Sequence, residues 1–85
     1  MKVKVLFFAS LREQLGRSQE ELDFSESINS LEKLKSHLRA RGGAFEKAFG
    51  GKALVRGAVN QVMAQPGAPI KAGDEVAFFP PVTGG

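Results

Sequence analysis

One stretch of the chain, residues 27–43, has the period of an amphipathic helix and is long enough for several turns. Its apolar side chains recur at spacings of three and four: Ile28, Leu31, Leu34 and Leu38. The other apolar segments are shorter, and several alternate with polar residues as strands do. A chain of 85 residues has room for one domain. The sequence therefore predicts an α+β fold, with one main helix packed on one face of a mixed four- or five-stranded sheet.

Strand and turn patterns stand on both sides of this helix. The expected elements are a strand over 2–8, a helical turn over 10–16, a strand over 18–24, a short turn over 44–51, a strand over 53–60, an edge strand or extension over 61–65 and a last strand over 75–79. The first and last strands are expected to be adjacent and parallel. The expected caps are Ser10 and Gly16 for the first turn, Ser27 or Asn29 for the start of the main helix, and Gly42-Gly43 for its end.

Alternation within the strands assigns side chains to the two faces of the sheet. The residues expected to face the helix are Val3, Val5, Phe7, Val76 and Phe78, because the opposite choice would bury lysines and a glutamate. Phe8 and Phe79 then point away from the helix, and Met63 is expected to join them. Large apolar groups gathered on an uncovered sheet face indicate a protein partner.

Composition argues against several kinds of chemistry. The sequence has no cysteine, which excludes disulfides, thiolate metal sites and a cysteine nucleophile. It has a single histidine, which argues against a multi-histidine metal site or a catalytic triad, and no bound metal is expected. That histidine, His37, flanks the apolar stripe and is expected to be a partly buried helix residue.

Charge and hydropathy also limit the partners. The net charge of +3 is spread along the chain with acids and bases interleaved, which argues against nucleic-acid binding. No apolar run reaches the roughly 18 residues of a membrane-spanning helix. The N-terminus, MKVKVLFFAS, alternates as a strand does and lacks the apolar stretch of a signal peptide. We therefore expect a cytoplasmic protein with no membrane partner.

The chain ends in FFPPVTGG, which contains no charged residue. Two prolines cannot donate ladder hydrogen bonds, so the last strand should stop there and the chain should leave it extended. We therefore expect a domain over 1–80 and an extended tail over 81–85. Glycines can thread a channel too narrow for any Cβ and leave the terminal carbonyl open to attack. The expected threading residues are Pro81, Val82, Thr83 and Gly84, and Gly85 is the expected carrier of an activated group.

Several of these segments resemble the small, sulfur-carrying subunit of molybdopterin synthase, whose family has the ubiquitin-like β-grasp fold. The similar segments are KVLFFAS, LREQLG, AVNQ and GDEVAFFPPVTGG. The likeness covers nearly the whole chain and is most specific at the C-terminus, whereas residues 18–52 match only as a pattern of elements.

The resemblance implies a chemistry for the terminus. A partner related to ubiquitin-activating enzymes would adenylate the Gly85 carboxylate with ATP. Sulfide from a sulfur donor enzyme, which holds it as a cysteine-derived persulfide, would then replace AMP and leave a thiocarboxylate. The large subunit would accept the tail and pass its sulfur to cyclic pyranopterin monophosphate, in two rounds, building the dithiolene that holds molybdenum or tungsten.

The resemblance also implies an assembly. The catalytic side chains would belong to the large subunit, so this chain would be a non-catalytic, sulfur-donating subunit with no permanently bound cofactor. Two small and two large chains would form a heterotetramer. The residues that fall where the family contacts its partner are Phe8, Arg12, Met63 and Phe79.

Two other functions share the same features. A sulfur carrier for thiamin synthesis or tRNA thiolation would have the same fold and diglycine but dock elsewhere. A ubiquitin-like modifier would instead form isopeptide bonds with lysines. The terminal FFPPVTGG favours the molybdopterin carrier.

Overall fold

A computed structural model describes residues 1–50 and 55–80. These residues form β1 (Lys2–Phe7), α1 (Ser10–Leu15), β2 (Gln19–Asp23), α2 (Leu31–Arg39), α3 (Gly43–Phe49), β3 (Arg56–Val59), β4 (Val62–Ala64) and β5 (Glu75–Phe79). The element order is the one expected from the sequence. Residue 51, the first two residues of the predicted strand over 53–60, and the whole predicted tail over 81–85 lie outside the described residues.

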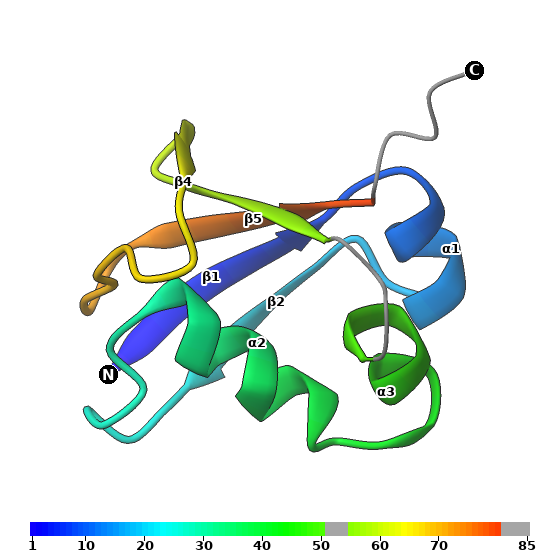
Figure 1. Ribbon diagram of the computed structural model, residues 1–85, viewed down its shortest axis with the longest axis horizontal. Coiled ribbons are helices and arrows are strands. Elements are labelled where there is room, and N and C mark those ends of the chain that lie inside the picture. Colours follow the sequence, from blue (N-terminus) through cyan, green and yellow to red (C-terminus); the bar gives the residue numbers. More distant parts are fainter. Residues whose placement is uncertain (51–54, 81–85) are drawn as a thin grey trace.

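The strands make one mixed sheet in the order β2-β1-β5-β3-β4. β1 and β5 are adjacent and parallel, which confirms the prediction, and the other neighbouring pairs are antiparallel. Figure 1 shows α2 and α3 on one side of the sheet and α1 just beyond the end of β1. Within the described ranges no helix covers the opposite side. The fold is therefore the predicted α+β arrangement, with β5 in the middle of a five-stranded sheet.

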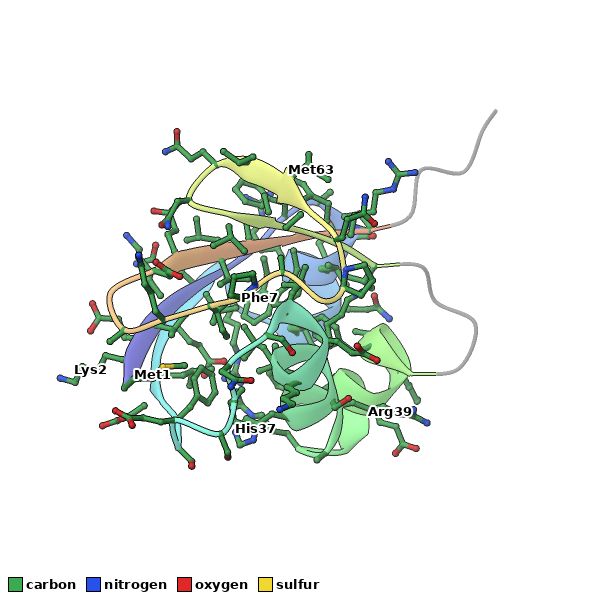
Figure 2. All side chains as sticks on the ribbon, turned by 60° about the vertical axis from the view of Figure 1, so that its left-hand side comes forward. Met1, Lys2, Phe7, His37, Arg39 and Met63 are labelled. Carbon is green, nitrogen blue, oxygen red and sulfur yellow. The ribbon has the colours of Figure 1, made fainter. Side chains whose placement is uncertain are left out.

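The core lies between the sheet and the helices. All the residues predicted to face the helix are buried there: Val3, Val5, Phe7, Val76 and Phe78. They meet the leucines of the helix stripe, Leu31, Leu34 and Leu38, and the rings of Phe45 and Phe49. Figure 2 shows Phe7 between the sheet and α2. Its ring stacks on Phe78 with centroids 6.4 Å apart. Strand alternation thus predicted the buried face correctly.

The start of α2 differs from the prediction. Its N-cap is Ser30, whose Oγ accepts a hydrogen bond from the Lys33 N–H at 3.2 Å, so neither Ser27 nor Asn29 is the cap. The Asn29 carbonyl accepts from the N–H of Ile70, and Ser30 forms an isolated bridge with Pro69. These contacts hold the backbone extended until Ser30, and the helix begins after it.

Two of the other predicted caps also differ in the structure, and one is confirmed. Ala9, with φ of 52°, is the N-cap of α1, so the expectation for Ser10 was wrong by one residue. The Leu11 N–H donates to the Phe8 carbonyl directly after β1, so the turn that leads into the helix begins one residue earlier than expected. Gly16, with φ of 70°, ends α1 as predicted. Gly42 caps the start of α3 instead of ending α2, which stops at Ala40.

His37 is exposed, not partly buried as expected. Its ring packs edge-to-face on Phe24, with centroids 5.0 Å apart. The position beside the stripe was right, but the side chain lies outside the core because α2 covers the sheet with its leucine face only.

Candidate partner-binding face and tail root

The side of the sheet away from the helices carries a continuous apolar surface, which we call the open face. It consists of Leu6, Phe8, Ala58, Met63, Ala77 and Phe79. Strand register places four of these in one row, in which Leu6 lies opposite Ala77, Ala77 opposite Ala58, and Ala58 opposite Met63. The row crosses four of the five strands, so the apolar surface spans most of the sheet's width.

The side chains of the open face differ in exposure: the two alanines in the row are buried, and the larger side chains around them are more exposed. Ala77 and Ala58 are only 7% and 4% exposed, because their methyl groups lie below bulkier neighbours. Met63 is 58% and Phe8 41% exposed. Figure 2 shows Met63 on the side away from the helices. Large apolar side chains that remain this exposed form a surface suited to a protein partner.

An aromatic pair marks the C-terminal end of the two central strands. The rings of Phe8 and Phe79 stack with centroids 4.9 Å apart and planes 7° apart. The Phe8 N–H donates to the Phe78 carbonyl at 3.1 Å, which continues the parallel ladder by one residue and fixes Phe8 beside Phe79. Because Pro80 follows Phe79 directly, the segment 81–85 is attached at this aromatic pair. Five residues can reach at most about 17 Å from that point.

The structure brings together three of the four predicted partner-contact residues. Phe8, Phe79 and Met63 share the open face, as strand alternation predicted. Arg12 is exposed on α1, one turn beyond Phe8. The threading residues and the carrier residue, Pro81, Val82, Thr83, Gly84 and Gly85, lie outside the described residues. The roles assigned to all of these residues remain predictions.

Charged residues flank the apolar row unevenly. At the end where the strand β5 begins, register places Lys4 between Glu21 and Glu75. At the other end Arg56 lies opposite Phe79. Sequence reasoning missed Arg56 as a candidate. Alternation could have placed it on the face of Ala58, but its nearness to Phe79 follows only from the β3–β5 register.

A separate charged cluster lies on the helix side of β2. The Glu20 carboxylate accepts hydrogen bonds from Arg17 Nη1 and Arg41 Nη1, each at 2.7 Å, and the Arg41 guanidinium lies 4.0 Å from the centroid of the Phe45 ring. Burial of Glu20 alone would raise its pKa. The hydrogen bonds and charges of Arg41 and Arg17 outweigh burial and lower the pKa below 4.5. The cluster ties the chain after α1 and the chain after α2 to β2, so its role is structural.

The described ranges contain neither a metal-binding group of side chains nor a membrane-spanning helix. Residues 1–50 and 55–80 hold no group of three or more histidine, aspartate or glutamate side chains arranged to bind a metal ion. None of the helices there is long and apolar enough to span a bilayer.

A helix-covered mixed sheet with parallel first and last strands, an apolar outer face and a C-terminal diglycine defines the ubiquitin-like β-grasp class of carriers. The comparison with known families agrees, because the model of the ThiS family matches residues 5–85. The chain belongs to the ThiS family and, at 43% identity, to its molybdopterin synthase sulfur carrier branch.

Three similar proteins illustrate this family membership. The molybdopterin synthase sulfur carrier subunit of Escherichia coli is 43% identical over 84 residues, which cover 98% of this chain and 99% of the relative. A Pyrococcus furiosus structure, provisionally assigned as molybdopterin converting factor subunit 1, is 31% identical with a TM-score of 0.77, covering 96% and 99% of the two chains. SAMP1 of Haloferax volcanii is 26% identical with a TM-score of 0.80, and both chains are covered completely.

Proposed function

We propose that this chain is the sulfur-carrier subunit of a molybdopterin synthase. One observation supports this most strongly: a stacked, partly exposed aromatic pair stands at the point where a chain ending in Gly-Gly leaves the sheet. Docking of the open face on a partner would bring the terminus to a fixed place, within the roughly 17 Å that five residues can span. The relative named a sulfur carrier subunit matches this chain in sequence along nearly its whole length, and the structure assigned as a converting-factor subunit has the same fold along nearly its whole length.

The terminus supplies the chemistry. The Gly85 carboxylate attacks the α-phosphorus of ATP, and pyrophosphate leaves. The terminal sulfur of a donor enzyme's persulfide displaces AMP from the acyl carbon and forms an acyl disulfide. A thiol reductant then cleaves the S–S bond, which leaves a thiocarboxylate on Gly85 and a disulfide on the thiol side. With no cysteine in the sequence, the terminal carbonyl is the place on this chain where sulfur can be held as an acyl group. Glycine suits this position because the Cα next to the acyl carbon carries no side chain that could hinder attack.

The partner supplies the rest. The tail residues from Pro81 to Gly84 thread into the large catalytic subunit, and Phe8, Arg12, Met63 and Phe79 contact its surface. The sulfur passes to cyclic pyranopterin monophosphate, and the carrier leaves as a carboxylate to be recharged. The large subunit contributes the acid, base and phosphate-binding groups, in a cytoplasmic heterotetramer of two small and two large chains.

Intact-mass analysis tests this proposal. The purified chain is incubated with ATP, the adenylating enzyme, a persulfide donor and a thiol reductant, then mixed with the large subunit and the pyranopterin substrate. The expected result is a mass gain equal to the exchange of one oxygen for one sulfur, lost again when dithiolene product forms. A thiocarboxylate that forms but is never discharged by the large subunit would refute the molybdopterin assignment and favour a carrier for thiamin or tRNA thiolation.

The similarity to SAMP1, a small archaeal modifier protein, favours a second candidate, covalent attachment to lysine side chains. Conjugation would appear in the same experiment, performed in cell extract, as adducts heavier than the chain by the mass of an acceptor protein. Absence of adducts alongside thiocarboxylate formation would exclude the modifier function.

A further inference from the structure

Arg56 is a cation at the edge of the apolar surface, next to the point where the tail begins. It is the first residue of β3 and lies opposite Phe79 in the antiparallel β3–β5 register. Residues directly opposite in such a pair have Cβ atoms about 4.5–5.5 Å apart, on the same face of the sheet. Gly57, the next residue, lies on the helix side against Leu31, which places Arg56 on the open face.

Arg56 has no ionic partner within the chain as far as the structure describes it. It is exposed, and the ion pairs among residues 1–50 and 55–80 involve other cations, namely Met1, Arg17 and Arg41. No acidic residue lies opposite it in the sheet, since its partner there is Phe79. A guanidinium beside an apolar docking surface loses water when a partner covers that surface, and this costs free energy unless a carboxylate replaces the water.

Lys4 gives an internal contrast. It has the same sign of charge and lies on the same face, at the opposite end of the strands. Register places it between Glu21 on β2 and Glu75 on β5, so Lys4 has acidic neighbours on both adjacent strands, although the ion pairs of the described residues do not include it. The two ends of this side of the sheet therefore differ: the cation at the tail end, Arg56, lies opposite Phe79, and the cation at the far end, Lys4, lies between two acidic residues.

We propose that Arg56 is a specificity residue of the carrier, which pairs with a carboxylate on the large subunit beside the entrance of the channel that receives the tail. This inference rests on the proposed function, because it takes the large subunit as the occupant of the open face. The partner surface that fits this face is apolar where it meets Phe8, Phe79 and Met63, and it carries an aspartate or glutamate next to the tail channel. The pair would orient the carrier so that the tail root faces the entrance.

Binding measurements with matched variants test the inference. Four full-length carriers, Arg56→Ala, Arg56→Glu, Lys4→Ala and Phe79→Ala, are titrated against the intact large subunit by calorimetry at low and high salt. Arg56→Ala should weaken binding roughly tenfold, and Arg56→Glu by about another tenfold, as for truncation and reversal of a desolvated charge pair. Lys4→Ala removes the same net charge and should change the affinity by less than about threefold, as for an exposed cation with acidic neighbours.

The outcomes distinguish a failure of the role proposed for Arg56 from a failure of the proposed function. If Phe79→Ala weakens binding while Arg56→Ala does not, the open face is the interface and the role of Arg56 is wrong. If Lys4→Ala weakens binding as much as Arg56→Ala, only net charge matters and the inference is likewise overturned. If all four variants bind with wild-type affinity, the open face is not the docking surface and the inference is overturned, whereas the proposed function fails only if the wild-type carrier does not bind the large subunit.

Two further measurements identify the partner group. A carboxylate at the channel entrance of the large subunit, changed to lysine, should restore the binding of Arg56→Glu and weaken that of the wild-type carrier. Adenylation by the activating enzyme should proceed at the wild-type rate in Arg56→Ala. Slowed adenylation with unchanged affinity for the large subunit would mean that the activating enzyme contacts Arg56, and would overturn the proposal.

Discussion

Phe78 and Phe79 are neighbours on β5 that point to opposite faces of the sheet, so truncating each one separates stability from binding. Phe78 is 0% exposed and packs on Phe7 and Phe49 in the core. Phe79 is half-buried and stacks only on Phe8 among the described aromatic rings. We predict that Phe78→Ala reduces the free energy of unfolding and that Phe79→Ala reduces affinity for the large subunit.

The magnitudes follow from burial. Replacing a fully buried phenylalanine by alanine costs about 3–5 kcal/mol, a large part of the roughly 5–15 kcal/mol that stabilises a small domain. Phe79→Ala loses the stacked pair, worth about 0.5–1.5 kcal/mol, and the half of the ring's burial already present in the free chain, worth about 0.75–1.5 kcal/mol. At about 4–8 °C per kcal/mol for a domain of this size, Phe78→Ala should lower the melting temperature by at least about 12 °C, and Phe79→Ala by less.

Binding should show the reverse order. Full burial of a phenylalanine is worth about 1.5–3 kcal/mol, and since Phe79 is already half-buried, the complex gains about half of that. Each 1.4 kcal/mol is a factor of ten, so area alone gives roughly four- to tenfold, and the cavity left in the complex adds to it. Phe78→Ala, assayed well below its melting temperature, should bind within about threefold of wild type.

Thermal melts and calorimetric titration on the same preparations provide the assay. A stable Phe79→Ala variant with reduced affinity, beside a destabilised Phe78→Ala variant with normal affinity, is the expected result. Unchanged affinity together with a large loss of stability for Phe79→Ala would place this ring in the core and refute the assignment of faces.

Three further predictions concern the terminus, the helix stripe and the Glu20 cluster. One residue added after Gly85 should abolish thiocarboxylate formation and leave the melting temperature unchanged; sulfur transfer by a variant shown by mass to remain uncleaved would contradict this. Leu34→Ala, at a fully buried position of α2, should cost about 2–5 kcal/mol by urea melts, whereas the exposed Lys33→Ala should cost under about 0.5 kcal/mol. Because the folded pKa of Glu20 lies below 4.5, its stabilising effect is present above that pH and is lost as pH falls through the folded value. Glu20→Gln should therefore be less stable than wild type at neutral pH, and the difference should shrink in acid; an equal difference at pH 7 and in strong acid would be evidence against the charge pairing.

The faces of the sheet could be predicted from sequence because alternation leaves only two choices for each strand. In β1 one choice buries Val3, Val5 and Phe7, and the other buries two lysines. The free-energy difference between these choices is large, so the outcome does not depend on details of the fold. The open face with Phe8 and Phe79 follows from the same choice.

The caps of the helices could not be predicted with the same certainty. Ser27, Asn29 and Ser30 are all good N-cap residue types, and they differ little in intrinsic preference. Hydrogen bonding of Asn29 with Ile70, about 40 residues later in the chain, keeps the backbone extended at that point and leaves Ser30 as the cap. Local sequence has no information on this tertiary contact.

The neighbours of Arg56 could not be predicted from the sequence either, because they depend on the register between β3 and β5. With the register observed, Arg56 lies opposite Phe79. A shift of four residues along β5 would place Arg56 opposite Glu75, where it would have an acidic partner within the chain. The register follows from the tight turn at Asn60 and Gln61, both with positive φ, which joins β3 to β4 and is tied to β5 through a hydrogen bond from the Glu75 N–H to Asn60 Oδ1.

The central position of β5 explains how one short strand can serve both the fold and the carrier function. Ladders with β1 on one side and β3 on the other hold the strand along its length, up to Phe79. Its alternate residues anchor the core through Phe78 and supply the open face through Phe79, so the point where the tail begins is fixed relative to the docking surface before any partner binds. Preorganisation of this kind lowers the entropic cost of association. A carrier that must dock, discharge and leave for every sulfur can therefore use a modest apolar surface, provided that one charged contact at the tail root selects the right partner.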